Sequence, residues 1–147
     1  VKDIDRTMFG YDTLKLINRT VEDNSGIEYF NLLVNTLGGL DDELISLDTL
    51  RFWLYVHLLK LGGHSPNLKT DEAGNKLKAE KNYNFDIDSM GFVNQSRGRY
   101  QARHIKLLRV AMGVDSPKKL TQLQGSEEIM PVCLELAKAM ISQYVRI

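Results

Sequence analysis

The sequence predicts a mainly α-helical fold, a helical bundle of about six helices with one small inserted β-hairpin, in a single domain over residues 1–147. Apolar residues recur at three- and four-residue intervals through most of the chain, which is the spacing of amphipathic helices. Only residues 83–93 alternate apolar and polar side chains as a half-buried strand does. The composition, with 43% hydrophobic and 26% charged residues in a chain of 147, is that of one globular domain with its own core.

Three helices are expected in the first half of the chain. The first covers residues 4–21, where apolar side chains share one helical face. Ser25-Gly26-Ile27-Glu28 fits a capping box and starts the second helix, which should end at Gly38-Gly39. The third should begin at Asp41 or Asp42, where acids complement the helix dipole, and end at Gly62-Gly63. Apolar residues cover most of its circumference, which predicts the central, most buried helix.

The segment after the third helix changes its pattern. Residues 64–75 are polar and rich in turn formers. Residues 83–88 alternate aromatic or aliphatic side chains with polar ones, which predicts a strand. Ser89-Met90-Gly91 should form the turn and Phe92-Val93 the return strand, with Lys76-Leu77-Lys78 as a short edge.

Three more helices are expected towards the end of the chain. One should run from about Gln101 to Gly113, with apolar residues on a single stripe. Ser116-Pro117 is a typical helix start and predicts a short helix to about Leu123. The last helix should open at Gly125-Ser126, and its apolar stripe consists of Ile129, Cys133, Leu136, Met140 and Tyr144.

The order of these elements is similar to the C-terminal helical domain of the RecO family, bacterial mediators of recombinational DNA repair. The matching stretches are residues 50–68, 83–92 and 102–109. The more specific part is the turn Leu61-Gly62-Gly63-His64-Ser65-Pro66 joined to the downstream hairpin. The resemblance covers essentially the whole chain.

The resemblance implies a non-catalytic repair domain of the RecF pathway. Its expected partners are single- and double-stranded DNA, the protein RecR, and the C-terminal tail of single-strand-binding protein. The family also has an N-terminal oligonucleotide-binding barrel. Because the chain starts at Val1 instead of methionine, we expect it to be a piece of a longer protein that carries such a barrel upstream.

Many relatives carry a four-cysteine zinc site just after the turn at Pro66. Residues 66–74 contain no cysteine, and Cys133 is the only one in the chain. Thiolates are the ligands that hold a structural zinc ion, so we expect no metal and no cofactor. The hairpin should instead be held by the packing of its apolar side chains on the helices, through Tyr83, Phe85, Ile87 and Phe92.

The remaining composition predicts a cytoplasmic protein without a membrane partner. A single cysteine makes no internal disulfide, which suits a reducing compartment. The charged start of the chain lacks the apolar core of a secretory signal. No stretch approaches the roughly 18 uninterrupted apolar residues that a membrane span needs.

The best functional signal is a basic segment hidden by a net charge of zero. Residues 97–119 contain seven Lys and Arg but only one acid, Asp115. Guanidinium groups pair with phosphates, and a neighbouring aromatic ring can stack on a base. The simpler interpretation is a solvated basic face. The predicted DNA-binding residues are Arg97, Arg99, Tyr100, Arg103, His104, Lys106, Lys118 and Lys119.

Two alternatives remain open. The chain could be a pure protein-interaction domain, with an apolar groove rimmed by Lys or Arg that takes an acidic-aromatic tail. The sequence does not place this groove. The chain could also be a metal-dependent enzyme, since Asp86 and Asp88 would lie on one face of a strand. The polar outer face of a hairpin is the simpler interpretation of this pair, so no catalytic residue is expected.

Overall fold

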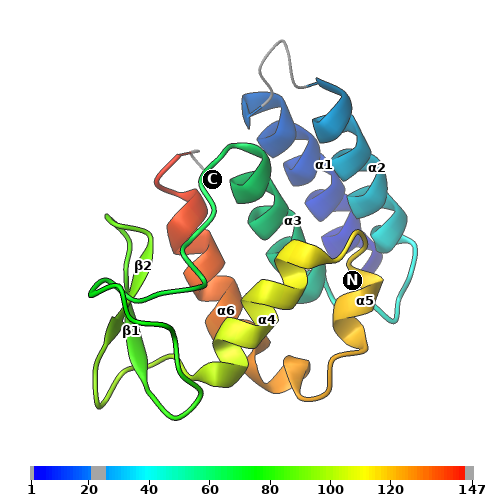
Figure 1. The fold of residues 1–147 in the computed structure, drawn as a ribbon. Coiled ribbons are helices and arrows are strands. Elements are labelled where there is room, and N and C mark those ends of the chain that lie inside the picture. The colour runs from blue at the N-terminus through cyan, green and yellow to red at the C-terminus, as the bar shows by residue number, and fades with distance from the viewer. Residues whose placement is uncertain (1, 21–25, 145–147) are drawn as a thin grey trace.

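The protein is a helical bundle with a small hairpin at one end, and the computed structural model describes residues 2–20 and 26–144 (Figure 1). The predicted fold class is confirmed: the described residues form six helices and one two-stranded antiparallel sheet. In chain order the elements are α1 (Lys2–Thr20), α2 (Gly26–Leu40), α3 (Leu47–Leu61), β1 (Tyr83–Asp86), β2 (Gly91–Asn94), α4 (Ala102–Gly113), α5 (Lys118–Thr121) and α6 (Ser126–Ile141).

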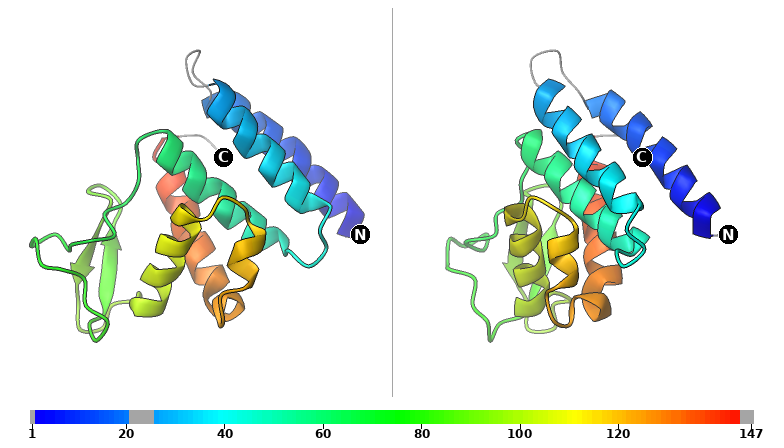
Figure 2. Two further views of the ribbon diagram at one scale, coloured as in Figure 1. Left: turned by 45° about the vertical axis from the view of Figure 1, so that its right-hand side comes forward. Right: turned by 90° about the vertical axis from the view of Figure 1, so that its right-hand side faces the viewer.

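Helix α3 is the central element, as its all-round apolar sequence predicts. It packs against α1 and α2 on one side and against α4 and α6 on the other (Figure 2). Nine of its 15 residues are buried. The indole Nε1 of Trp53 donates to the carbonyl of Val114, 3.2 Å away, which fixes the end of α4 on α3. The hairpin lies at the opposite end of the molecule from α1 and α2 (Figure 2).

Two predicted helix boundaries are wrong, and both errors lie where α2 meets α3. Helix α2 continues through Gly38-Gly39 to Leu40. Gly39 is needed for close packing, because a Cβ there would collide with the side chain of Leu50. Helix α3 starts at Leu47 instead of Asp41, since the Ser46 hydroxyl accepts the N–H of Thr49 (3.1 Å) and caps it. The predicted capping box at residues 25–28 begins outside the described residues.

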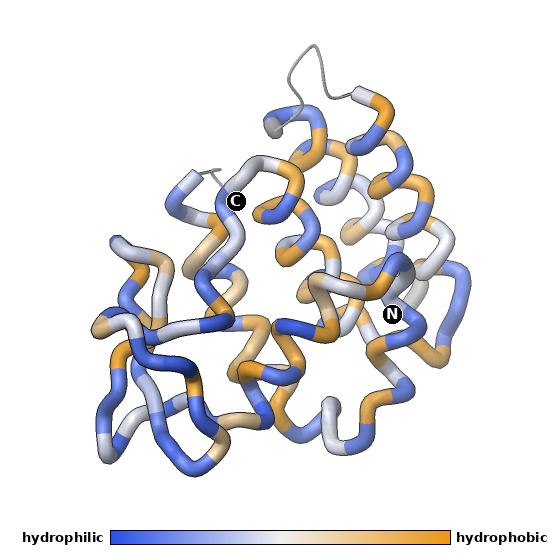
Figure 3. Tube along the Cα trace, in the orientation of Figure 1, coloured by the Kyte–Doolittle hydropathy of each residue, from blue (hydrophilic) through white to orange (hydrophobic). Residues whose placement is uncertain are grey.

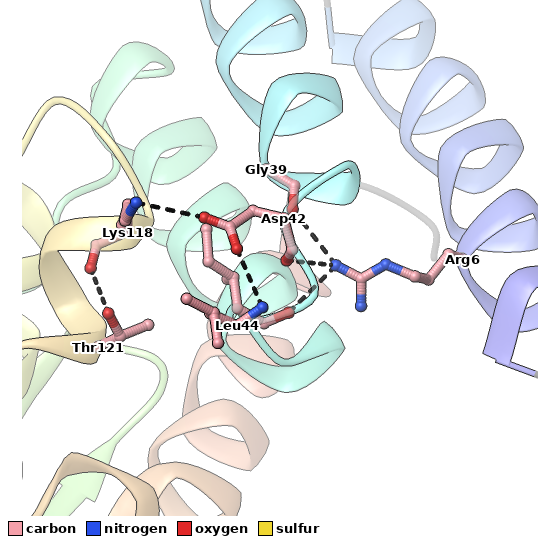
Figure 4. A network of polar contacts seen from close by, with 7 residues as sticks. Arg6, Gly39, Asp42, Leu44, Lys118 and Thr121 are labelled. Carbon is pink, nitrogen blue, oxygen red and sulfur yellow. Dashed lines mark hydrogen bonds and ion pairs between the residues drawn. The ribbon is translucent and has the colours of Figure 1, made fainter.

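The turn between α2 and α3 is held by Arg6 of α1 (Figure 4). Its guanidinium group donates to four backbone carbonyls, with distances of 2.8 to 3.3 Å. The carboxylate of Asp42 in the same turn accepts the N–H of Leu44 (3.0 Å) and pairs with Lys118 of α5 (3.5 Å). This network therefore joins α1, the turn and α5. The carbonyls that Arg6 contacts belong to Gly39, Leu40, Asp42 and Ile45.

Removing the guanidinium of Arg6 should destabilise the domain. Hydrogen bonds to charged groups contribute about 1.5–3 kcal/mol each, non-additively, so we expect Arg6→Ala to lower the free energy of unfolding by about 2–3 kcal/mol in urea denaturation. Arg6→Lys should recover only part, because one ammonium cannot reproduce the planar fork. Lys15→Ala, at an exposed position of the same helix, should change it by less than about 0.5 kcal/mol. Equal losses for Arg6→Ala and Lys15→Ala would contradict this role.

The hairpin pairs Phe85 with Phe92 across its two strands. A hairpin is present as predicted, but β1 ends at Asp86, residues 87–90 form the turn, and Gly91, predicted in the turn, begins β2. The predicted edge at Lys76 is wrong, because Lys76 bridges to Thr70 within the preceding loop instead of joining the sheet. This loop and the hairpin are largely hydrophilic along the chain (Figure 3).

An aromatic cluster attaches the hairpin to the helices. The ring of Phe92 is fully buried and meets Phe85 edge-to-face at a centroid distance of 4.9 Å. Tyr83 and Tyr100 meet the same ring edge-to-face at 6.2 and 6.1 Å. Such aromatic pairs stabilise a fold by more than the burial of their apolar surface alone contributes. The predicted packing of the hairpin is confirmed, with Ile87 partly buried against the core.

The predicted helices after the hairpin are present as α4, α5 and α6. Four of the five residues of the last predicted stripe are buried, whereas Tyr144 lies beyond α6 and stacks on His64 at 3.6 Å. No helix within residues 2–20 and 26–144 combines the length and apolar character that crossing a membrane requires.

Candidate functional site

Three of the predicted DNA-binding cations, Arg97, Arg99 and Arg103, lie around the start of α4. Arg99 makes a two-pronged ion pair with Glu135 of α6, at 2.9 and 3.3 Å. This pairing raises the pKa of Arg99 and lowers that of Glu135. Arg103 pairs with Glu128 of the same helix at 3.5 Å. Arg97 is exposed, and its loop is packed on β1, because a Cβ at Gly98 would collide with the Tyr83 backbone.

Lys118 and Lys119 lie beyond the other end of α4, which at 12 residues spans about 18 Å. Lys118 pairs with Asp42 (3.5 Å), and Lys119 pairs with Asp115 (2.8 Å). The predicted residues therefore do not form one surface, and acids neutralise four of them. Within the part of the chain that the structure describes, only Arg97 and Lys106 of the predicted cations are exposed without an ion pair.

Tyr100 and His104, two of the predicted DNA-binding residues, are buried in the core. Tyr100 is 7% exposed and His104 is 5% exposed, and their rings pack edge-to-face. Nδ1 of His104 accepts the N–H of Gln101 (3.0 Å) and so completes a capping box at the start of α4. Burial, and then the charges of Arg103 and Arg99, lower the pKa of His104. Burial likewise raises the pKa of Tyr100.

The lowered pKa of His104 predicts a loss of stability in mild acid. The folded state binds this proton less readily than the unfolded chain, whose histidines titrate near pH 6.5, so stability falls as the pH drops below about 6.5. We expect the free energy of unfolding in urea to decrease between pH 7.5 and 5.5. His104→Gln keeps a side chain suited to the capping box and should make this decrease smaller. An unchanged decrease in that variant would exclude His104 as its source.

A groove that the sequence could not place lies between α1, α3 and α6. It is a cavity of about 530 Å³. Phe9, Leu16, Leu54 and Tyr55 are its apolar lining, and all four are buried. Around them are four basic side chains and one acid, Asp12. The basic side chains of this basic-rimmed groove are Lys15, Arg19, Arg51 and Lys138.

Two side chains in the groove have features that suit a bound ligand. The Arg51 guanidinium lies 5.2 Å from the centre of the Phe9 ring, a cation–π contact that leaves the guanidinium edge available. Thr13 lines the groove and is 2% exposed, and its hydroxyl has no hydrogen-bond partner among the described residues. A buried hydroxyl without a partner is costly. Burial also raises the pKa of Tyr55.

The residues present do not fit a four-cysteine zinc site of the kind expected from the RecO resemblance. The sole cysteine, Cys133, is fully buried in α6, and burial raises the pKa of its thiol to about 12. Residues 66–74, where the relatives' ligands begin, have none. Over residues 2–20 and 26–144 no three His, Cys, Asp or Glu side chains cluster as metal ligands would.

Asp86 and Asp88 do not lie on one strand face, because β1 ends at Asp86 and Asp88 is in the turn. The Asp86 carboxylate accepts the N–H of Asp88 (3.2 Å). A hydrogen bond from the Ser89 side chain is the largest cause of its lowered pKa. Asp86 thus shapes the turn, and the predicted placement of Asp86 and Asp88 on one strand face is wrong.

No protein-family model, curated protein or solved structure matches this chain. The fold class is therefore described from the structure itself, as a helical bundle with an inserted hairpin, and kinship with RecO stays a prediction from the order of the elements.

Proposed function

We propose that this chain is a non-catalytic DNA-repair mediator domain of the RecO type, and that its basic-rimmed groove binds the acidic-aromatic tail of single-strand-binding protein. The observation that carries the proposal is the groove's composition: four basic side chains surround an apolar lining. An aromatic side chain of the tail would fill the apolar part, and its carboxylates would face the rim. DNA and RecR are the further partners that the resemblance implies.

Charge and size both favour such an occupant. Arg51 and Lys138 contribute cations from α3 and α6, and among the described residues that line the groove Asp12 is the one acid, so this described lining carries more positive than negative charge. Charge-assisted hydrogen bonds to carboxylates are roughly twice as strong as neutral ones. A cavity of about 530 Å³ falls in the usual range for sites that enclose a small ligand. It therefore suits the last few residues of a peptide.

A pure protein-interaction domain is the second candidate, and the ion pairs of the predicted basic segment favour it. Arg99, Arg103, Lys118 and Lys119 already have acidic partners. Binding DNA there would require breaking these pairs. Under this candidate the domain would bind the tail alone, and DNA would be handled by another part of the full protein.

Fluorescence anisotropy with a labelled acidic-aromatic tail peptide tests the proposal directly. We expect saturable binding that weakens as salt rises, because charge pairs are screened. A peptide with its terminal aromatic residue changed to alanine should bind at least tenfold more weakly, since burying one aromatic side chain contributes about 1.5–3 kcal/mol. Equal affinity for both peptides, or no binding at low salt, would contradict the proposal.

A further inference from the structure

A second cavity, of about 340 Å³, lies beside the hairpin, and most of the residues that line it are charged or carry amide side chains. None of the predicted DNA-binding residues lines it. The acid in its lining is Asp71, which is only 6% exposed. The other side chains around this lysine cavity are Lys76, Lys78, Lys81, Asn75, Asn94 and Tyr83.

In the loop before β1 the lysine side chains are exposed. Leu77 is partly buried against the core, whereas Lys76 and Lys78 on either side of it are exposed. The bridge between Lys76 and Thr70 and the bond from the Lys78 N–H to the Tyr83 hydroxyl (2.9 Å) fix the backbone on both sides of Leu77. The three lysines therefore stand on a braced backbone around one cavity.

These lysines differ from four of the six predicted DNA-binding cations, which are held in ion pairs. Lys76, Lys78 and Lys81 form no ion pair with any residue in the described ranges. One Asp71 oxygen, Oδ1, accepts the N–H groups of Ala73 and Asn75, both at 2.9 Å, so this oxygen is engaged by the loop itself. An anion could bind the lysines without displacing a protein carboxylate.

We infer that the lysine cavity binds backbone phosphates of a nucleic acid strand. Three ammonium groups meet phosphates as point charges, and the Asn75 and Asn94 amides add hydrogen-bond donors. The cavity lacks the apolar lining of the basic-rimmed groove, so it offers no anchor for an acidic-aromatic peptide. The inference rests on the proposed DNA-repair function and moves the domain's DNA contact from α4 to the hairpin end of the molecule.

The test compares two variants of the 147-residue chain that each lose three cations. One is Lys76→Gln, Lys78→Gln, Lys81→Gln, and the matched control is Arg97→Gln, Arg103→Gln, Lys106→Gln. All six side chains are exposed, so both variants should fold, which circular dichroism and thermal unfolding verify. Affinity for a labelled single-stranded oligonucleotide is measured from about 50 to 200 mM salt, the range in which phosphate contacts dominate.

In the lysine-cavity variant we expect log K to fall less steeply with log salt, with a slope that is shallower by about 2, since each lost contact with a single strand removes roughly 0.7 from its magnitude. At 0.1 M salt the affinity of this variant should be about a hundredfold lower. The control should lose less than about threefold. Equal losses in both variants, a larger loss in the control, or no oligonucleotide binding by the unchanged chain would overturn the inference.

The tail-peptide titration on the same lysine-cavity variant separates this inference from the proposed function. The affinity for the tail peptide should stay unchanged, because the basic-rimmed groove lies between α1, α3 and α6 and none of the three substituted lysines lines it. If the variant loses peptide binding but keeps oligonucleotide binding, the cavity belongs to a protein partner and the inference is wrong. If the unchanged chain binds oligonucleotide through the cavity but binds no tail peptide, the groove proposal fails while this one stands.

Discussion

Lys138→Glu is expected to lower the affinity for the acidic-aromatic tail peptide about 10- to 100-fold. The side chain is exposed on α6 and lines the basic-rimmed groove. Hydrogen bonds to charged groups contribute about 1.5–3 kcal/mol, and each 1.4 kcal/mol is a factor of ten in affinity. Reversal also places a carboxylate against those of the peptide. Arg51→Glu should weaken binding by at least as much, because Arg51 can hold a carboxylate with two bonds.

Lys106→Glu is the matched control for this prediction. It makes the same change of charge on the exposed face of α4, outside the groove. We expect its peptide affinity to stay within about twofold of the unchanged chain, since separated surface charges are screened at physiological salt. Similar losses from Lys138→Glu and Lys106→Glu would show that the peptide responds only to net charge, which would contradict a defined groove.

Phe92→Ala is expected to have the largest effect on stability, lowering the free energy of unfolding by about 3–5 kcal/mol. The Phe92 ring is fully buried and contacts three other aromatic rings. Truncating a buried aromatic side chain removes its transfer free energy and leaves a cavity. The edge-to-face contacts of Tyr100 with Phe92 and with His104 connect this aromatic packing to α4. Urea denaturation followed by circular dichroism measures the loss.

Val93→Ala is the control, because Val93 is the next residue on the same strand but is only partly buried. It should lose less than about 1 kcal/mol, within the usual range for partly exposed positions. We also expect the unfolding midpoint of the unchanged chain to be the same with a chelator or with added zinc. A stability gain on adding zinc, or a loss for Phe92→Ala as small as for Val93→Ala, would refute attachment by aromatic packing.

The elements of this fold were predictable because their signals are local. The apolar periodicity of α3 and the alternation of β1 each lie within one segment, and both predicted elements are present. The predicted boundaries of α2 and α3 are wrong at the point where contacts with residues distant in the sequence determine where a helix ends or begins. Asp41 and Asp42 look like a helix start, but Arg6, more than 30 positions away, holds them in a turn, and Ser46 caps α3 instead.

The candidate site was less predictable, because charge partners come from distant segments. Arg99 and Glu135 are 36 positions apart, so the basic segment reads as unpaired in the sequence although the fold neutralises much of it. Tyr100 directly follows Arg99 in the sequence, but backbone pairing with Tyr83 accompanies the burial of its ring in the core. The groove draws its lining from three helices, so no single stretch of sequence shows it.

Nuclear magnetic resonance mapping of the tail peptide tests the central claim most directly. The amide signals of the isotope-labelled chain are followed while unlabelled peptide is added. We predict that the largest shifts cluster at the groove, at Thr13, Arg51, Tyr55 and Lys138, while the hairpin signals stay in place. Shifts centred on β1, β2 or the exposed face of α4, or no shifts at saturating peptide, would contradict the assignment of the groove as the tail-binding site.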